Sequence, residues 1–504
     1  MHALHSPQEA ARWLHQRVTG VLRTDSRQVQ PGDGFIAWPG AVTDGRQYLD
    51  KALAQGAAAC LMAAEGSEPW QGLQPADRLA ALPQLKALTG LVADAYYEQP
   101  SRRLEVLAVT GTNGKTSTAW WLAQALGSPV LQRTCALVGT LGVGVLPHLQ
   151  GTGMTTPDPV LMQARFKDFA DAGVGFCAIE ASSIGLAEHR LDGTRIRSAI
   201  FTNFTQDHLD YHGSMATYWA AKRALFAWEG LQAAVLNIDD AQGALLAQEL
   251  TTTSLDVWTC SRRGLARLQA RLQPSPHGLS FDVIEGAECQ RLDTALIGDY
   301  NVDNLLGVIG ALRSVGIPLA QAVSACQHLS AVPGRMERVG SPEPGPLALV
   351  DYAHTPDAVT QALSALQTLA RARGGQLWCV LGCGGDRDPG KRPLMAAAAQ
   401  ALADQVVLTS DNPRSESPQA ILDQMVTGLN DTASAQVVVD RAEAIALAVS
   451  RAQAADVVLV AGKGHEDYQD VQGVRLPFSD AQHLQAALQA RQMGVMAGAT
   501  EVKA

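Results

Sequence analysis

Apolar segments that alternate with helical patterns divide the chain into three predicted α/β units. In the middle unit, residues 106–110 are a short apolar run, followed by a glycine-rich turn. The next segment carries Trp121, Leu122, Ala125 and Leu126 at the spacing of a buried helix face. Further apolar strands end at residues 180 and 202. We therefore predict a P-loop-type domain with a mostly parallel sheet at residues 101–332.

Five apolar segments in the last part of the chain run into polar loops, nearly all rich in Gly, Asp, Arg or His. They cover residues 347–351, 376–381, 405–409, 437–439 and 456–460. Near-continuous apolar strands that alternate with helices are typical of a doubly wound parallel sheet. We predict a Rossmann-like domain at residues 333–504, with a ligand-binding edge where its strands end.

The first hundred residues show weaker signals of the same kind. Helical patterns cover residues 7–16 and 47–55, and a short strand covers residues 57–62. A Pro-Ser-Arg-Arg linker follows at residues 100–103. We predict a small α/β domain at residues 1–100, and three domains agree with 504 residues at ~150 residues per domain.

Composition excludes several classes of protein. Hydrophobic residues make up 47% of the chain and charged residues 17%, which indicates compact domains and not disorder. The net charge of −10 argues against broad binding to nucleic acid or to an anionic membrane. No apolar run approaches the ~18 residues of a membrane helix, and the start of the chain lacks a signal-peptide pattern. Scattered cysteines without a C-x-x-C pair suit a reducing compartment, so we expect a cytoplasmic protein without membrane insertion.

The turn after residues 106–110, T-G-T-N-G-K-T at 110–116, is a candidate phosphate-binding loop. Glycines let backbone N–H groups face an anion, Lys115 can reach the outer phosphates, and the Thr116 hydroxyl can ligate magnesium. Val109 stands where the general P-loop pattern has glycine, so the loop is a narrower form. The alternative is an ordinary turn with a solvated lysine. We predict that ATP contacts Gly111, Thr112, Asn113, Gly114, Lys115, Thr116 and Ser117.

Two other strands of the middle unit end in groups that can bind magnesium. Glu180 closes the apolar segment 175–180, and His208 follows the segment 198–202. Parallel strands end at one edge of a sheet, so both residues should lie beside the phosphate loop. Taken singly, Glu180 could be a surface acid and His208 a turn histidine.

Lys222 lies among apolar residues of a predicted helix at 215–228. Loss of hydration lowers the pKa of a lysine, and its neutral amine can act as a ligand or base, or react with carbon dioxide to form a carbamate. A lysine whose amine reaches solvent is the alternative. The residues alone leave both open.

Other polar segments are candidates for substrate contacts. Ser26 lies in a turn-rich segment that can bind a phosphate or sugar, although most such turns are merely solvated. The amides of Asn301 and Asn304 can hydrogen-bond a purine edge, although helix capping would also explain Asn301. Candidate hydroxyls and cations near Glu180 are Thr155, Thr156, Ser182 and Arg190.

These motifs together resemble those of the Mur ligases, the ATP-dependent amide-forming enzymes of bacterial cell-wall precursor synthesis. Beside the phosphate loop, the matching segments are E-x-S-S at 180–183, D-H-L-D-Y-H-G at 207–213, A-A-K at 220–222, Y-N-V-x-N at 300–304, P-G-R-M-E at 333–337, D-Y-A-H-T-P-D at 351–357 and G-C-G-G-D-R-D at 382–388. D-N-P-R at 411–414 and G-K-G-H-E at 462–466 resemble the members that add meso-diaminopimelate to UDP-N-acetylmuramoyl-L-alanyl-D-glutamate. The resemblance covers almost the whole chain and implies ATP and Mg²⁺ as cofactors, an acyl-phosphate intermediate, and a monomer.

The resemblance also implies roles for particular residues. ATP would further contact Asn301, Asn304, Arg335 and Asp351. The metal would lie near Thr116, Glu180, His208 and a carbamylated Lys222. The muramoyl dipeptide would contact Ser26, Thr155, Thr156, Ser182 and Arg190. Diaminopimelate would contact Arg387, Asp411, Asn412, Pro413, Arg414, Gly462 and Glu466.

Three positions depart from the family pattern. Ile184 replaces a common histidine, Glu188 replaces a glutamine that contacts substrate, and the segment 41–43 differs, so no uridine contact is carried over there. A folylpolyglutamate synthase shares the phosphate loop, but D-N-P-R and the first domain do not suit it. A P-loop regulator or transport ATPase, or a non-catalytic module on a degenerate ligase, would not explain the intact amino-acid loops.

Overall fold

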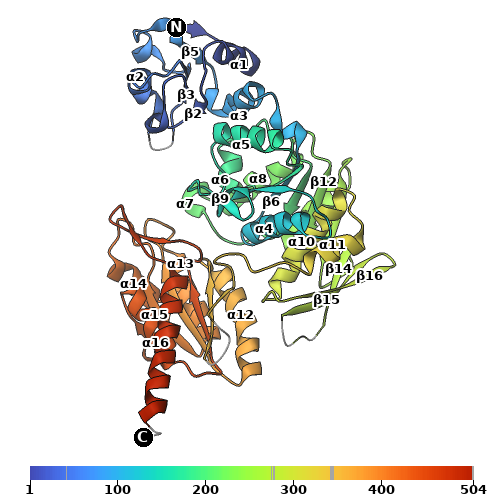
Figure 1. Ribbon diagram of the computed structural model, residues 1–504, viewed down its shortest axis with the longest axis vertical. Helices are drawn as coiled ribbons and strands as arrows, with labels where there is room; N and C mark the ends of the chain where they lie inside the picture. Colours follow the sequence, from blue (N-terminus) through green and yellow to red (C-terminus); the bar gives the residue numbers. More distant parts are fainter. Residues whose placement is uncertain (41–42, 274, 276–277, 341–344, 502–504) are drawn as a thin grey trace.

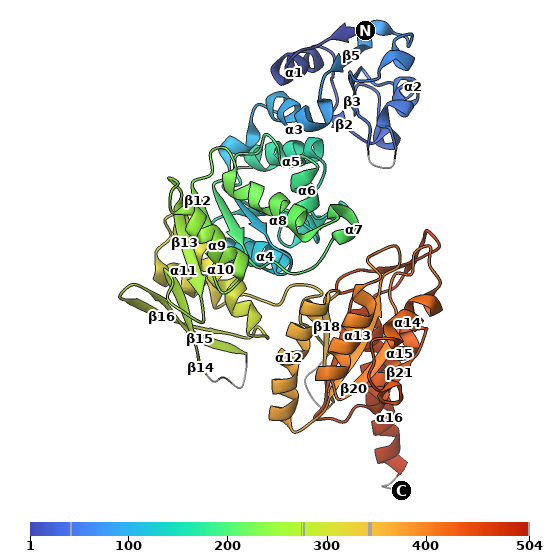
Figure 2. The same ribbon diagram turned by 180° about the vertical axis from the view of Figure 1, so that it is seen from behind.

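The computed structural model describes residues 1–40, 43–273, 275, 278–340 and 345–501, with side chains up to residue 493. Three sheets, each covered by helices, follow one another along the longest axis of the molecule, and the central unit contacts both neighbouring units (Figures 1 and 2). The α/β class predicted from the sequence is confirmed.

The first unit has a fully parallel, five-stranded sheet in the order β1-β5-β4-β3-β2. Alternate strand residues face two clusters, one under α1 and α3 and one under α2. The predicted helix at 47–55 is shorter in the structure, because a 3₁₀ turn at Gly45–Tyr48 precedes α2. The elements are β1 (His2–Ala3), α1 (Pro7–His15), β2 (Leu22–Arg23), β3 (Gly34–Ala37), α2 (Leu49–Ala54), β4 (Ala59–Ala63), β5 (Leu79–Leu82) and α3 (Leu85–Tyr96).

The central sheet has eleven strands in the order β16-β15-β14-β13-β12-β11-β6-β10-β7-β8-β9. The strands from β14 to β7 pair in parallel, as predicted, and antiparallel strands extend both edges. The strands are β6 (Glu105–Thr110), β7 (Cys135–Gly139), β8 (Gly142–Val145), β9 (His148–Gln150), β10 (Phe176–Glu180), β11 (Ser198–Phe201), β12 (Ala233–Asn237), β13 (Asp256–Ser261), β14 (Leu268–Gln273), β15 (Leu279–Glu285) and β16 (Glu288–Thr294).

Helices cover both faces of this sheet, which is why its parallel strands are apolar on both sides. One buried cluster joins the sheet to α4 (Lys115–Gly127), α10 (Tyr300–Ser314) and α11 (Leu319–Cys326). The other joins it to α5 (Pro159–Asp171), the 3₁₀ turn Ala224–Ala227 after α8 (Met215–Arg223), and α9 (Ala241–Leu250). Two short helices, α6 (Ser183–Ala187) and α7 (Leu209–His212), follow β10 and β11.

The last unit is doubly wound, as predicted, with strand order β17-β18-β22-β19-β20-β21. Its five predicted strands are parallel, whereas β17 is an antiparallel edge strand that was not predicted. Helices α12, α13 and α14 cover one face and α15 and α16 the other. The elements are β17 (Glu337–Val339), β18 (Leu347–Asp351), α12 (Pro356–Arg373), β19 (Leu377–Cys383), α13 (Lys391–Leu402), β20 (Gln405–Ser410), α14 (Pro418–Val426), β21 (Ala435–Val437), α15 (Arg441–Arg451), β22 (Val457–Ala461), a hairpin of β23 (Tyr468–Val471) and β24 (Val474–Pro477), and α16 (Asp480–Glu501).

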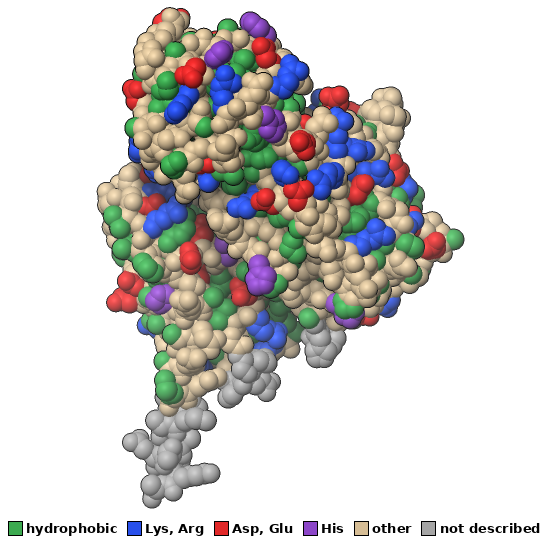
Figure 3. All heavy atoms as spheres, turned by 45° about the horizontal axis from the view of Figure 1, so that its top comes forward, with side chains coloured by type: hydrophobic (Ala, Val, Ile, Leu, Met, Phe, Trp, Pro, Cys, Tyr) green, Lys and Arg blue, Asp and Glu red, His purple; other side chains and the backbone are tan. Residues whose placement is uncertain are grey.

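Surface and thiol features agree with the composition. Acidic and basic side chains are interspersed on the face shown in Figure 3. All eight cysteines are free thiols, and all but Cys289 are buried. Among the residues that the structure describes, no helix is both long and apolar enough to traverse a bilayer.

Candidate functional site

The phosphate loop between β6 and α4 fits closely between two neighbouring segments. Gly111 has a φ of +151°, and a Cβ there would lie 1.8 Å from the Thr202 hydroxyl. Gly114 has a φ of +83°, and a Cβ there would lie 2.3 Å from Asn304 Oδ1. Only glycine satisfies both the backbone angle and the space at these positions, so the loop shape depends on the two glycines.

The segment after β11 holds this loop through hydrogen bonds. Thr112 N donates to Asn203 O at 2.9 Å, and Asn113 N donates to Asn203 Oδ1 at 2.8 Å. Within the loop, Lys115 Nζ donates to Gly111 O at 2.9 Å and to Thr112 O at 2.8 Å. Burial lowers the pKa of Lys115. Its ammonium group is thus held within the loop, where the sequence predicted phosphate.

Glu180 lies beside the phosphate loop, as the parallel-edge argument predicted. β10 is the neighbour of β6, and Glu180 Oε2 accepts a hydrogen bond from Thr116 Oγ1 at 2.9 Å. Thr140, which follows β7, donates its N–H to Glu180 Oε1 at 2.7 Å. Glu180 is buried, so the surface-acid alternative is wrong. Thr140 was missed, although a polar residue directly after an apolar strand at this edge was the available signal.

His208 lies on the segment that packs against the phosphate loop, but it contacts a different carboxylate. Its Nε2 is 3.4 Å from Asp207 Oδ2, and His354 Nε2 of the last unit is 3.8 Å from the same oxygen. Burial lowers the pKa of His208 to about 4, so its ring is neutral at pH 7. Within the described part of the chain, no three His, Cys, Asp or Glu groups form a metal-binding cluster. The donors that do meet are the oxygens of Thr116 and Glu180, which suit magnesium.

Lys222 is buried under the phosphate loop and does not reach solvent, so that alternative is wrong. Lys222 is only 1% exposed, and its Nζ donates to Gly111 O at 2.7 Å. The amine also lies 4.4 Å from the centre of the Tyr218 ring. Burial lowers the pKa of Lys222 well below its ordinary value, and the charge of Lys115 lowers it further. The neutral amine can therefore react with carbon dioxide.

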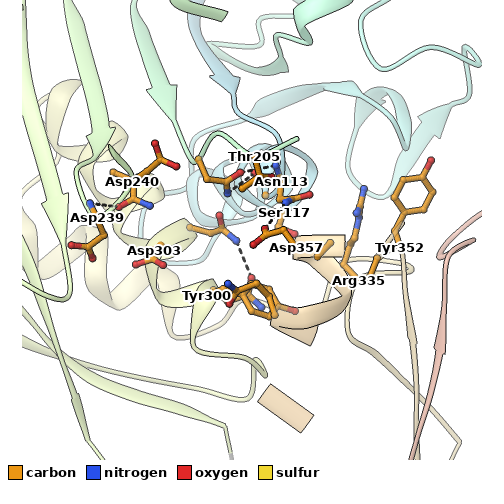
Figure 4. A pocket seen from close by; sticks show the side chains of 18 of the residues that line it. Asn113, Ser117, Thr205, Asp239, Asp240, Tyr300, Asp303, Arg335, Tyr352 and Asp357 are labelled. Atoms are coloured by element: carbon orange, nitrogen blue, oxygen red, sulfur yellow. Dashed lines mark hydrogen bonds between the residues drawn. The ribbon is translucent and has the colours of Figure 1, made fainter. Parts of the chain in front are cut away.

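A cavity of about 230 Å³ lies between the central and last units, and the phosphate loop forms one of its walls (Figure 4). Asn113 Nδ2 donates across it to Asp357 Oδ2 at 3.1 Å. Asn304 Nδ2 donates to Asn301 Oδ1 at 3.0 Å, and both residues line the cavity. Asp299, not Asn301, is the N-cap residue of α10, but Asn301 Nδ2 also has a structural partner, because it donates to Ile297 O at 2.7 Å. The cavity has polar groups on both sides where a nucleotide is predicted.

Arg335 joins the last unit to the phosphate loop. Its Nη2 donates to Thr116 Oγ1 at 3.3 Å, and its guanidinium lies 4.3 Å from the centre of the Tyr352 ring. Asp351 accepts a hydrogen bond from Met336 N at 2.7 Å, and burial raises its pKa. Arg335 Nε is buried without a protein partner. An unpaired guanidinium N–H beside the phosphate loop fits a phosphate group.

The predicted contacts for the muramoyl dipeptide gather behind Glu180, except Ser26. Thr156 Oγ1 donates to Glu180 O at 2.7 Å and lies 2.9 Å from Ser182 Oγ. Arg190 Nη1 donates to Thr156 O at 3.0 Å, and Thr155 Oγ1 lies 3.0 Å from Thr140 Oγ1.

Ser26 belongs to the first unit, in a 3₁₀ turn at Ser26–Gln28 that Asp25 caps. A cavity of about 890 Å³ lies between the first and central units. Asp25 and Gln28 line it from the first unit, and Met154 and Asp158 line it from the central unit. Residues 41 and 42 of the departing segment lie outside the described residues.

Two departures from the family pattern lie on or next to α6. Ile184 is a residue of this helix, and Glu188 caps its end. Glu188 Oε2 is 2.7 Å from Lys86 Nζ on α3 of the first unit, and Glu188 Oε1 accepts from the Tyr211 hydroxyl on α7. In this chain, therefore, the carboxylate links the first unit to the segment that carries His208.

Most residues predicted to bind diaminopimelate meet where β20 and β22 end. Asn412 Nδ2 donates to Glu466 Oε2 at 2.7 Å, and a Cβ at Gly462 would lie 2.6 Å from Asp411 Oδ2.

Arg414 has a φ of +51°, and its Nη1 donates to Gly385 O at 2.6 Å. Pro413 packs close to Gly385, where a Cβ would lie 1.9 Å from Pro413 O. Arg387 lies beside the same loop: a Cβ at Gly384 would lie 2.9 Å from Arg414 Nη1 and 3.9 Å from Arg387 Cγ, and Arg387 Nη1 donates to Asp386 O at 3.3 Å. Lys463, which was not predicted, lies at the centre of the group.

Comparison with known proteins covers all three units. The family model for the Mur ligase middle domain matches residues 109–312, that for the Mur ligase glutamate ligase domain matches residues 334–464, and that for the Mur ligase family catalytic domain matches residues 19–86. A protein of Acidovorax sp. (strain JS42) named UDP-N-acetylmuramoyl-L-alanyl-D-glutamate--2,6-diaminopimelate ligase is 60% identical over 502 residues, covering 98% of this chain and 99% of its own.

Solved structures show the same architecture. A structure of UDP-N-acetylmuramoyl-L-alanyl-D-glutamate--2,6-diaminopimelate ligase matches with a TM-score of 0.64 at 36% identity, covering 94% of this chain and 95% of that one. The MurF ligase of Thermotoga maritima, solved in complex with ADP, matches with a TM-score of 0.63 over 95% of this chain and 98% of its own, at 16% identity. The family models and the near-full-length identity show that this chain belongs to the Mur ligase family.

Proposed function

We propose that the chain is an ATP-dependent amide ligase of peptidoglycan-precursor synthesis. It adds meso-diaminopimelate to the D-glutamate side-chain carboxylate of UDP-N-acetylmuramoyl-L-alanyl-D-glutamate, and it releases ADP and phosphate. Residues 1–100 bind the UDP end of that substrate, residues 101–332 bind ATP, and residues 333–504 bind the amino acid. The enzyme acts in the cytoplasm as a monomer.

The observation that carries this proposal is the 60% identity, over nearly the whole of both chains, to a ligase of that name. The geometry supports the reaction class independently. The phosphate loop, the buried Glu180 and the loops of the last unit belong to two facing sheet edges, and Arg335 spans them.

Phosphoryl transfer requires positive charge and hydrogen-bond donors around the γ-phosphate. Lys115, Arg335 and the backbone N–H groups of the phosphate loop supply them. Thr116 and Glu180 would hold magnesium together with His208 and a carbamylated Lys222, and magnesium when bound offsets charge on the phosphate oxygens. The acceptor is the D-glutamate side-chain carboxylate, which becomes an acyl phosphate.

The amine of diaminopimelate then attacks the acyl phosphate and displaces phosphate. Arg414 selects the amino acid. Diaminopimelate has a second carboxylate at the end remote from the attacking amine, and a guanidinium can bind that carboxylate with two parallel hydrogen bonds. The loops at 411–414 and 462–466 hold the amine in line with the acyl carbon, and such positioning supplies much of the rate enhancement.

A coupled assay of phosphate release tests the proposal, with mass spectrometry of the product. We expect release only when ATP, the UDP-linked dipeptide and an amino acid are all present, with meso-diaminopimelate preferred over lysine. Folate with glutamate serves as the control for a folylpolyglutamate synthase. Phosphate release without the muramoyl dipeptide, or equal rates with lysine and diaminopimelate, would refute the proposal.

A further inference from the structure

Lys463 is a fully buried lysine that contacts three residues of the predicted amino-acid site. Its side chain is 0% exposed. Nζ donates to Asn412 Oδ1 at 2.9 Å, and it lies 3.3 Å from Glu466 Oε2 and 3.6 Å from Asp411 Oδ1. A buried ammonium is stable only when polar partners replace its hydration, and here those partners are all predicted substrate contacts.

The contacts of Lys463 fix the orientation of the Asn412 side chain. Asn412 Oδ1 accepts hydrogen bonds from both Lys463 Nζ and Asp470 N, the latter at 3.0 Å. With its oxygen held in this way, the amide turns its NH₂ group toward Glu466 Oε2, 2.7 Å away. Lys463, Asn412 and Glu466 thus form a closed triangle of polar contacts.

Lys463 also sets the charge of this group. The carboxylates of Asp411 and Glu466 together carry two negative charges, and Lys463 offsets one of them. Burial and the charge of Asp411 raise the pKa of Glu466, whereas Lys463 lowers it and so favours the ionised form. The hydroxyl of Tyr352 also faces Glu466, at 3.4 Å.

The other buried cation nearby does not replace Lys463. Arg441 is fully buried, but Asp480 neutralises it through contacts at 2.7 and 2.8 Å. Arg441 donates its remaining hydrogen bonds to Ser410 O and Ala461 O, the last residues of β20 and β22. It therefore holds the strand ends together with its charge paired to Asp480, whereas Lys463 contacts the loop carboxylates of Asp411 and Glu466 directly.

We propose that Lys463 is a positioning residue that prepares the loops at 411–414 and 462–466 for the zwitterionic end of the incoming diamino acid. Asp411, Glu466 and Lys463 together leave one net negative charge, which attracts the ammonium group of the amino acid. Arg414 supplies the positive charge for the carboxylate next to that ammonium group. The inference rests on the proposed function and adds the residue that sets the charge and orientation of its amino-acid site.

The test compares steady-state kinetics of the full-length wild type with Lys463→Met, which removes the charge, and Lys463→Gln, which removes the charge but keeps a donor. We expect the KM for meso-diaminopimelate to rise at least tenfold in both variants, with the KM values for ATP and the UDP-linked dipeptide changed less than twofold. The preference for diaminopimelate over lysine should fall as well. Thermal unfolding verifies that each variant is folded.

A pH series separates this role from a merely structural one. Because Lys463 lowers the pKa of Glu466, its removal raises that pKa, so the variant-to-wild-type ratio of KM for diaminopimelate should shrink as the pH rises. Arg373→Met is the matched control, because Arg373 is a cation of the same domain that donates to Ala454 O and Ala455 O at the opposite edge of the sheet. We expect its kinetics to equal those of the wild type.

The outcomes are distinct. If the wild type does not add diaminopimelate, the proposed function is wrong, and the inference falls with it. If the wild type is active and both variants keep a KM for diaminopimelate within twofold, only the role of Lys463 is refuted. An equal rise in the KM values of all three substrates also refutes it, because that result indicates general disruption.

Discussion

Replacing Arg414 with alanine gives a quantitative test of how the enzyme selects its amino acid. The backbone at this position is held from both sides: Arg414 N donates to Asp470 O at 2.9 Å, and Gln472 N donates to Arg414 O at 2.7 Å. The side chain is fixed separately, through the bond from Nη1 to Gly385 O. Arg414→Ala therefore removes the guanidinium while the backbone contacts that shape the loop remain.

The size of the effect follows from the hydrogen bonds that are lost. A hydrogen bond to a charged group contributes ~1.5–3 kcal/mol, and ~1.4 kcal/mol corresponds to a tenfold change. Loss of even one of the two hydrogen bonds corresponds to roughly 10- to 150-fold, so we expect kcat/KM for meso-diaminopimelate to fall at least tenfold. The KM for ATP should not change, because Arg414 belongs to the amino-acid loops and the nucleotide cavity is lined by other residues.

Phosphate release measured with diaminopimelate and with lysine, at saturating ATP and UDP-linked dipeptide, provides the assay. Lysine lacks the distal carboxylate, so its slow addition should be nearly insensitive to the loss of Arg414. Arg371→Ala, at an exposed position on α12, controls for the loss of one positive charge. A less than threefold loss with diaminopimelate, or an equal loss with both amino acids, would show that the guanidinium does not select the substrate.

Four further outcomes follow from the described contacts. Glu180→Gln should lower kcat at least tenfold, measured by phosphate release, because it removes the negative charge next to the phosphate loop; an unchanged kcat would exclude Glu180 from metal binding. Depletion of carbon dioxide should lower activity, and bicarbonate should restore it and add the mass of one CO₂ to the peptide that contains Lys222; no response would refute carbamylation. Lys86→Met and Glu188→Gln should couple by about 0.2–1 kcal/mol in a double-mutant cycle of urea unfolding, since this ion pair is partly exposed; additive effects would mean that the pair contributes nothing. Burial lowers the pKa of His465 from 6.5 to about 4, so between pH 4 and 6.5 only the unfolded chain binds a proton at this residue. The free energy of unfolding therefore falls as the pH falls through this range. His465→Gln should flatten that dependence, and an unchanged slope would refute the assignment.

The sequence allowed prediction of those parts of the site that depend on local periodicity and on one topological rule. Apolar strands in a parallel sheet must end at a common edge, and this rule alone brought Glu180 next to the phosphate loop. Burial of Lys222 was left open because a helix pattern does not reveal what covers each face. The contact with Gly111 O, more than a hundred residues away along the chain, decides it.

Other features depend on contacts that no local pattern specifies. The hairpin of β23 and β24 was missed because each strand has only four residues and neither is buried, and its pairing with Arg414 keeps that residue in the left-handed region. Lys463 stands inside a motif that was noted, yet its burial follows from Asn412, 51 residues earlier. His208 was predicted beside the metal, but the orientation of its ring toward Asp207 depends on side-chain packing.

The connection between the central and last units runs directly past the phosphate loop. Trp121 Nε1 on α4 donates to Ser330 O at 3.0 Å, and Arg335, a few residues later, reaches Thr116. Any rotation of the last unit about this connection has its axis close to the phosphate loop. Atoms near a hinge move little and those far from it travel furthest, so such a rotation would displace the loops at 411–414 and 462–466 more than the phosphate loop.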